Sequence, residues 1–152
     1  MDGIPEEYRR ILHILNRVDF FGRIKTGELD LLMKRLRRMT CPKGHVIIKE
    51  GEMGETFYLI SRGRVSIWKK KGMFKKVLLE TLGAEEFFGE MALVTNERRN
   101  ATVIAEDDCE LFILYKEDFK EILMTNPTTA NSIEEIVRER KAKNVIKIID
   151  SL

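Results

Sequence analysis

The stretch from Phe87 to Ala105 carries the residue types from which a sugar-phosphate site could be built. Gly89 and Glu90 precede the apolar run Met91–Leu93, a pattern typical of one helical turn whose first amides lack partners within the helix. Such amides favour an anion, and Arg99 could hold a phosphate through two parallel hydrogen bonds. Because Glu90 would repel a phosphate, it suits a hydroxyl donor such as a ribose 2′-OH. The pattern therefore predicts a site for a sugar joined to a phosphate.

Two stretches, in order along the chain, resemble the signatures of the cyclic nucleotide-binding domains. The first is Ile47–Gly63, in which Gly51 and Gly54 are predicted to supply positive φ at a chain reversal. The second is Phe88–Leu93, followed after five residues by Arg99–Val103, and it resembles the family's phosphate-binding cassette. The family includes the regulatory subunits of cAMP-dependent protein kinase, the catabolite activator protein, and cyclic nucleotide-gated and hyperpolarisation-activated channels.

The resemblance covers about Val18 to Arg140 and implies a cyclic nucleotide site. It implies that Arg99 pairs with the cyclic phosphate, Glu90 holds the 2′-OH and Ala92 offers its backbone amide. Asn100 is a departure, because the family usually has Ser, Thr, Ala or Gln after the phosphate arginine. The implied ligand is cAMP, with cGMP as the alternative. The candidate site residues are Val77, Phe88, Gly89, Glu90, Met91, Ala92, Arg99, Asn100, Ala101, Val103 and Arg140.

Three of these candidates concern the purine base. Val103 and Val77 are expected to touch it. Arg140 falls where some channel-type relatives carry an arginine that caps the base. The alternative for Arg140 is a surface arginine that extends past the apolar stripe of the last helix.

The resemblance implies a mainly β fold, an antiparallel jelly-roll β-barrel of about eight strands with N-terminal and C-terminal helices. The residue pattern agrees, because short β-rich runs are separated by glycines. We expect a helical segment at residues 1–38, the β-roll at 39–115 with the cassette at 87–105, and C-terminal helices at 116–152. The predicted strands are Val46–Ile48, Thr56–Ser61, Arg64–Trp68, Lys76–Leu82, Ala101–Ala105 and Glu110–Tyr115, with a further strand ending at Phe88.

Helical spacing of apolar residues predicts the flanking helices. The first is expected from Glu6 to about Val18, and the second begins with Thr26 as its N-cap. Asn126 and Pro127 are typical of a helix start, and this last helix is expected to reach about residue 149. Its apolar face is predicted to contain Ile133, Ile136, Val137 and Ile148.

Composition excludes several classes of function. At 152 residues the chain has the length of one domain, and its net charge of +2 is too small to indicate nucleic acid or an anionic membrane. No apolar run is long enough to span a bilayer. The basic cluster at residues 34–38 is interpreted as a solvated helix face, and Trp68–Lys76 as an exposed hairpin tip rather than a binding patch. No secretory signal is visible, and two cysteines are typical of reduced thiols in a cytoplasmic protein.

These observations leave two hypotheses. The first is a non-enzymatic sensor that binds a cyclic nucleotide, moves its C-terminal helix and acts on an effector protein or domain, with a homodimer as an alternative assembly. The second is a module that has lost its ligand and serves in protein interaction or dimerisation. A metalloenzyme is set aside because His13 and His45 fall in different elements, and no nucleophile–base pair is suggested.

Overall fold

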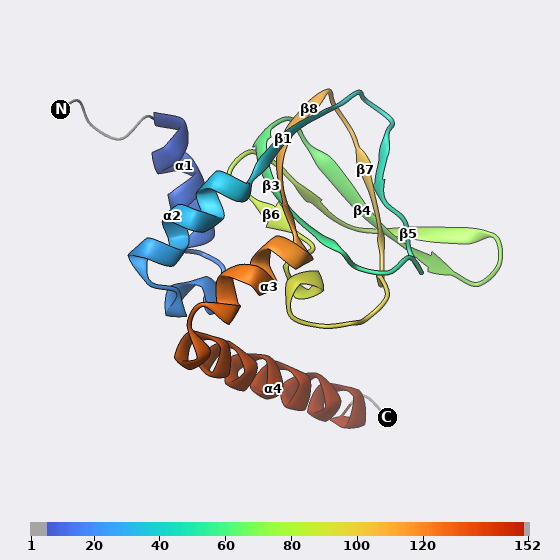
Figure 1. The fold of residues 1–152 in the computed structure, drawn as a ribbon. Coiled ribbons are helices and arrows are strands. Elements are labelled where there is room, and N and C mark those ends of the chain that lie inside the picture. Colours follow the sequence, from blue (N-terminus) through green and yellow to red (C-terminus); the bar gives the residue numbers. More distant parts are fainter. Residues whose placement is uncertain (1–5, 151–152) are drawn as a thin grey trace.

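The chain forms two antiparallel sheets of four strands each, flanked by helices (Figure 1). The computed structural model describes residues 6–150, apart from the side chains of Phe20 and of residues 140–150. One sheet has the order β1-β8-β3-β6 and the other β2-β7-β4-β5. The strands are β1 (Arg37–Cys41), β2 (Val46–Ile48), β3 (Thr56–Arg62), β4 (Val65–Lys71), β5 (Lys75–Leu82), β6 (Phe87–Phe88), β7 (Thr102–Ala105) and β8 (Cys109–Tyr115).

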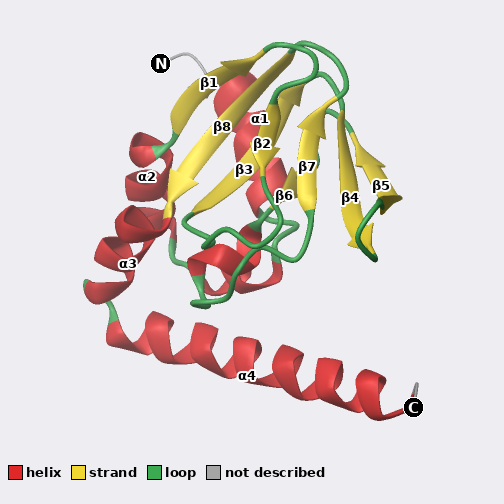
Figure 2. Cartoon of the chain, turned by 90° about the vertical axis from the view of Figure 1, so that its right-hand side faces the viewer, coloured by secondary structure: helices red, strands yellow, loops and turns green. Residues whose placement is uncertain are grey.

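The eight strands and the flanking helices are confirmed, whereas the sheets are not closed into a barrel. The chain changes sheet at most of its connections, and each ladder stays within its own sheet. The edge strands, β1 and β6 in one sheet and β2 and β5 in the other, form ladders only within their own sheet. The sheets therefore face each other as separate layers, as Figure 2 shows.

The strand β3 is buried on both faces and joins two cores. Phe57 and Leu59 point into a core shared with the helices, while Tyr58 and Ile60 point into the core between the sheets. This explains the continuous apolar run, because a strand covered on both sides needs no polar alternation. The helix-side core also contains Leu93, which belongs to the cassette.

Five helical segments flank the sheets: α1 (Glu6–Leu15), the 3-10 helix η1 (Asp19–Arg23), α2 (Thr26–Arg35), α3 (Lys116–Met124) and α4 (Pro127–Asp150). The predicted start of α4 is confirmed, because Asn126 Oδ1 accepts the amides of Thr128 and Thr129 at 3.1 and 3.3 Å. Within its described side chains, Ile133 and Val137 are buried as expected. Ile148 lies outside the described side chains.

Two predicted helix boundaries are wrong, the first by about three residues and the second by one. The first helix ends at Leu15, and Val18 is buried in the linker that follows. The N-cap of α2 is Lys25 rather than Thr26, because the Glu28 carboxylate accepts the Lys25 amide at 3.3 Å. A carboxylate three residues inside the helix can satisfy an unpaired amide at its start, so a capping hydroxyl is not required.

The predicted solvated face at residues 34–38 is split between a helix and a strand. Arg35 ends α2, whereas Arg38 lies in β1. Each of these two arginines makes two ion pairs with carboxylates of the domain, namely Glu7, Glu110, Asp118 and Glu121. Their charge is therefore compensated locally. Among residues 6–150 the structure contains no helix with the length and apolarity that a membrane span requires.

The two glycines of the first signature differ in their role. Gly51 has φ of 92° as expected, but Gly54 does not have positive φ, so that prediction is wrong. A Cβ added at Gly54 would lie 3.0 Å from the Cβ of Ala92. Gly54 therefore allows the first signature to pack tightly against the cassette.

Candidate functional site

The cassette begins where β6 ends and turns sharply into a 3-10 helix, η2 (Glu90–Leu93). Gly89 makes the turn with φ of 81°, and the predicted single helical turn follows it. Phe88 is buried and stacks on Tyr58, with ring centroids 4.9 Å apart. Ala92 is also buried. The stack of Phe88 on Tyr58 fixes the start of the turn to the core between the sheets.

Arg99 returns to the same point from the other end of the cassette. Its Nη2 donates to the carbonyl and the hydroxyl of Thr56 at 2.6 and 2.9 Å, and its Nη1 donates to the Gly89 carbonyl at 3.5 Å. The guanidinium is half-buried, as is Glu90. The sequence prediction that Gly89, Glu90 and Arg99 lie together therefore matches their positions.

The guanidinium of Arg99 is partly desolvated and lies among acidic groups. Burial lowers the pKa of its guanidinium, while Tyr58, Glu55, Glu52 and Glu90 oppose that change. An arginine stays charged in proteins because its ordinary pKa is so high. Arg99 thus presents a partly desolvated positive charge, which interacts more strongly with a phosphate than a fully solvated one does.

Gly89 is required by the close approach of the guanidinium. A Cβ at this position would lie 2.8 Å from Arg99 Nη1 and 3.2 Å from the Thr56 carbonyl oxygen. The positive φ would add backbone strain for any other residue. Glycine therefore has both a conformational and a packing role at this turn.

The backbone amide of Ala92 has a partner within the turn. It donates to the Gly89 carbonyl at 3.2 Å. Arg99 Nη1 points to that same carbonyl. A ligand oxygen that took the Ala92 amide would therefore compete with this carbonyl and rearrange the turn.

The remaining candidates are more dispersed. Val103 is buried between the sheets and pairs with Ile67, whereas Val77 is 41% exposed on β5 and pairs with Lys69. The structure does not bring these two valines together as cross-strand neighbours. Asn100 is exposed, and its carbonyl accepts Lys69 Nζ at 2.8 Å.

Three further candidates complete the predicted set. Met91 packs at the edge of the helix-side core, and Ala101 is half-buried just before β7. The backbone of Arg140 lies in α4, but its side chain lies outside the described part of the chain. Its predicted contact with the base thus stays a prediction.

Sequence reasoning missed two residues that organise the site. Thr56 supplies both acceptors that hold Arg99 Nη2. Lys116 is buried, and its ammonium donates to the Thr95 carbonyl and, at 2.7 Å, to Asn96 Oδ1. Burial lowers the pKa of Lys116. The lysine was predicted only to begin a helix, because one sequence cannot show that a charged side chain is buried.

Lys116 joins the middle of the cassette to the start of α3. Thr95 is in turn bonded to Met91, through its amide at 3.0 Å and its hydroxyl at 2.8 Å. A groove of about 550 Å³ lies beside this connection, between the cassette, α3 and α4. Its lining includes Leu93, Ile133 and Val137. The cassette and the C-terminal helices therefore share one contact region.

Comparison with known proteins identifies the family to which this chain is similar. Residues 38–126 match the model of the cyclic nucleotide-binding domain family. The cyclic AMP receptor protein of Thermus thermophilus is 30% identical over 120 residues, 79% of this chain and 56% of that protein. A cyclic nucleotide-gated potassium channel of Rhizobium etli is 33% identical over 144 residues, 91% of this chain and 39% of that protein.

A solved structure of cAMP-bound PfPKA-R superimposes with a TM-score of 0.72 at 33% identity, covering 80% of this chain and 43% of that one. The chain thus spans about half or less of the length of these three proteins. The matched region contains the turn at Gly89, the guanidinium that reaches it and the strands that hold both. With this match over more than half of its length, the chain belongs to the cyclic nucleotide-binding domain family.

Proposed function

We propose that this chain is a regulatory domain that binds a 3′,5′-cyclic nucleotide and has no catalytic role of its own. The observation that carries the proposal is the half-buried Arg99 guanidinium held beside the Gly89 turn. A cyclic phosphate would pair with this charge, and Glu90 would accept the 2′-OH of the ribose. The PfPKA-R structure that superimposes on this chain holds cAMP, which supports the same class of ligand here.

We propose cAMP as the preferred ligand, because Asn100 is bulky where the family accommodates a guanine that folds back over the phosphate. In calorimetric titration we expect cAMP to bind about tenfold more tightly than cGMP, the equivalent of one ordinary hydrogen bond. Asn100→Thr should improve cGMP binding with little change for cAMP, because a hydroxyl can reach the guanine amino group.

2′-Deoxy-cAMP should bind more weakly than cAMP, because it lacks the contact with Glu90.

Two outcomes of this titration would contradict the proposal. A preference of the unmodified chain for cGMP would refute the role given to Asn100. Binding of neither nucleotide would instead favour a module that has lost its ligand and serves in protein interaction.

We propose that binding moves α4 and that this movement reaches an effector protein or domain in the cytoplasm. The proposed coupling between the cassette and the C-terminal helices runs through hydrogen bonds of Thr95 within the cassette and of Lys116, the first residue of α3, with Thr95. Cys41 and Cys109 are buried and free, which suits a reducing compartment. The shift of α4 can be no larger than the difference in ligand affinity between its two positions.

Hydrogen exchange tests this coupling. Saturating cAMP should slow exchange of the α4 amides, and Lys116→Met should reduce that protection because it removes the ammonium that joins the cassette to α3. Lys120→Met is the matched control, since Lys120 lines the same groove but is exposed. If cAMP did not protect the α4 amides of the unmodified chain, the proposed route would be contradicted. Equal protection of α4 in Lys116→Met and Lys120→Met would contradict it as well.

A further inference from the structure

We propose that the tip of the β4–β5 hairpin is a docking site for an anionic lipid surface. The inference rests on this hairpin alone and does not depend on the proposed nucleotide site. It replaces the interpretation of Trp68–Lys76 as an exposed hairpin tip rather than a binding patch. It concerns Met73 and Phe74 at the tip and five lysines on the arms, Lys69, Lys70, Lys71, Lys75 and Lys76.

The two tip residues are almost wholly exposed. Met73 is 90% and Phe74 is 94% exposed. Isolated apolar side chains on a surface are ordinary. Two large neighbouring ones that bury almost nothing within the fold contribute little to its stability. Their exposure is explained if the tip enters an apolar phase.

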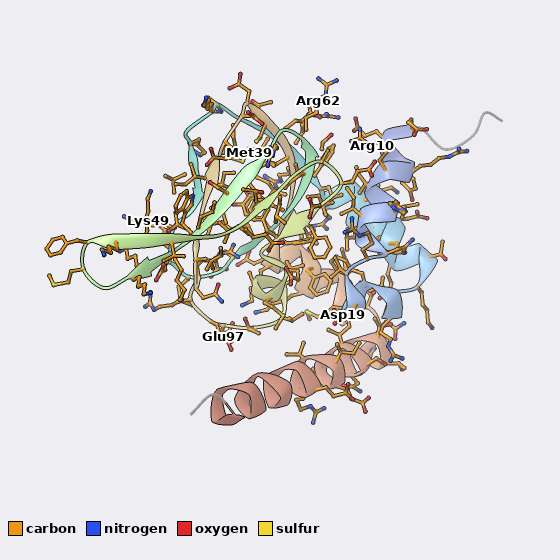
Figure 3. All side chains as sticks on the ribbon, turned by 180° about the vertical axis from the view of Figure 1, so that it is seen from behind. Arg10, Asp19, Met39, Lys49, Arg62 and Glu97 are labelled. Atoms are coloured by element: carbon orange, nitrogen blue, oxygen red, sulfur yellow. The ribbon has the colours of Figure 1, made fainter. Side chains whose placement is uncertain are left out.

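The tip of the hairpin stands clear of the rest of the roll, whereas its root is bonded to it, since the Lys70 amide donates to the Glu50 carboxylate at 3.0 Å. The strand β4 pairs with β7 only from Val65 to Trp68, so beyond Trp68 the two arms pair only with each other. Figures 1 and 3 show the hairpin projecting on the side opposite the N-terminal helices. A flat surface could therefore reach the tip without contacting those helices.

The charge of the arms is concentrated and of one sign. No acidic residue occurs between Lys69 and Leu79. Lys71 pairs with Lys75 and Lys70 with Lys76, and like charges directly opposite each other destabilise a sheet. None of the five lysines has an ion pair with a carboxylate among the described residues. This contrasts with Arg35 and Arg38, which are paired within the domain.

The apolar tip and the basic arms of the hairpin match the two layers of a membrane interface, which are the boundary of the acyl chains and the anionic headgroups. Met73 and Phe74 would enter the boundary between headgroups and acyl chains, while the lysines would lie at the level of the anionic headgroups. The net charge of the whole chain is only +2. The potential of an anionic surface falls off within a Debye length, so binding to that surface depends on the charge of the hairpin and not on the net charge of the chain.

A lipid surface fits the tip better than a nucleic acid does. Single strands are bound by basic grooves with aromatic side chains on which bases stack. Here the apolar tip is convex, and one of its two side chains is a thioether that offers no stacking face. The root of the hairpin is fixed, because Lys69 holds the Asn100 carbonyl and the Lys76 ammonium lies 4.8 Å from the centre of the Trp68 ring.

Vesicle co-sedimentation of the whole chain tests the proposal. We expect binding to phosphatidylcholine vesicles with about 30 mol% phosphatidylserine at about 0.1 M salt, and little to pure phosphatidylcholine. Met73→Ser with Phe74→Ser should weaken binding on the order of 100-fold, because the inserted apolar area is lost. Lys71→Glu with Lys75→Glu should weaken it at least about 20-fold.

Matched controls separate the hairpin from general surface effects. Met124→Ser removes an apolar side chain that is 81% exposed elsewhere, and Lys25→Glu with Lys34→Glu reverses two exposed charges away from the hairpin. Both controls should bind vesicles like the unmodified chain. Equal losses in controls and hairpin variants would overturn the proposal, because adsorption would then follow total charge or apolarity.

A spectroscopic variant reports on insertion itself. Trp68→Phe with Phe74→Trp leaves one tryptophan, at the tip, since the chain has a single Trp. Its emission should shift to the blue and be quenched by brominated acyl chains on anionic vesicles. Binding without that shift would overturn insertion. Hairpin-dependent binding of a homopolymeric RNA, with none to vesicles, would overturn the lipid surface in favour of nucleic acid.

Discussion

Replacing Arg99 with alanine should weaken binding of cyclic nucleotide by about 2–4 kcal/mol, on the order of 30- to 1,000-fold. The reason is that the variant leaves a desolvated phosphate without its counter-charge. Isothermal titration with cAMP measures the loss directly. Arg99→Lys should recover only part of it, because an ammonium cannot form two parallel hydrogen bonds with a phosphate.

The neighbouring Arg98 provides a matched control. It is exposed, and its Nη1 donates to the Gly51 carbonyl at 2.9 Å, away from the Gly89 turn. Arg98→Ala should leave the affinity nearly unchanged. If Arg98→Ala and Arg99→Ala lost affinity equally, Arg99 would not be the phosphate ligand.

The stability of the Arg99 variant needs its own measurement. From the sequence, Arg99 was expected to serve the ligand rather than the core, but its guanidinium also joins Thr56 on β3 to Gly89. We expect Arg99→Ala to lower the free energy of unfolding by about 1 kcal/mol, the usual contribution of such hydrogen bonds. Thermal unfolding without ligand separates this loss from the loss of binding.

Phe57→Ala should lower the free energy of unfolding by about 3–5 kcal/mol, because it leaves a cavity in the helix-side core. Phe57 is fully buried and meets Phe21 and Phe87 edge-to-face, at 5.6 and 5.9 Å between ring centroids. Chemical denaturation measures the change. The melting temperature should fall by about 10 °C or more.

Phe74→Ala is the control with the same chemical change at an exposed position. Because Phe74 is 94% exposed, its loss should alter stability by less than about 0.5 kcal/mol. If Phe57→Ala and Phe74→Ala lowered the free energy of unfolding by similar amounts, burial of Phe57 in the helix-side core would not explain its effect. Both variants keep Arg99, so cAMP binding can also report whether the folded fraction is native.

The sequence predicted the fold where pattern and composition agree. Short β-rich runs between glycines located five strands within one residue at each end, whereas β4 extends three residues beyond its predicted end at Trp68. Asn126 with Pro127 located the start of α4. The strand β1 was missed, because Arg37–Cys41 is largely polar and exposed and has no clear alternation. It is a strand because β8 pairs with it, which is a tertiary effect.

The candidate site also contains some residues that the sequence predicts and others that only the structure shows. Gly89, Glu90 and Arg99 were predictable because their types and spacing indicate an anion site. Thr56 was not, because it holds Arg99 through a contact that joins distant parts of the sequence. Lys116 was not, because only the folded chain shows that its ammonium bonds to Thr95 and Asn96 rather than to water.

The position of β8 between β1 and β3 has a kinetic consequence. Its ladder joins Cys109 to Cys41 and Leu114 to Phe57, so the sheet closes only after a long stretch of chain has been ordered. Contacts so distant in sequence slow folding, because the entropy of loop closure is lost before the contacts form. During synthesis β1 and β3 would emerge first and leave unpaired edges, which are prone to join other chains. Completion of β8 would then be the step that protects the nascent domain from aggregation.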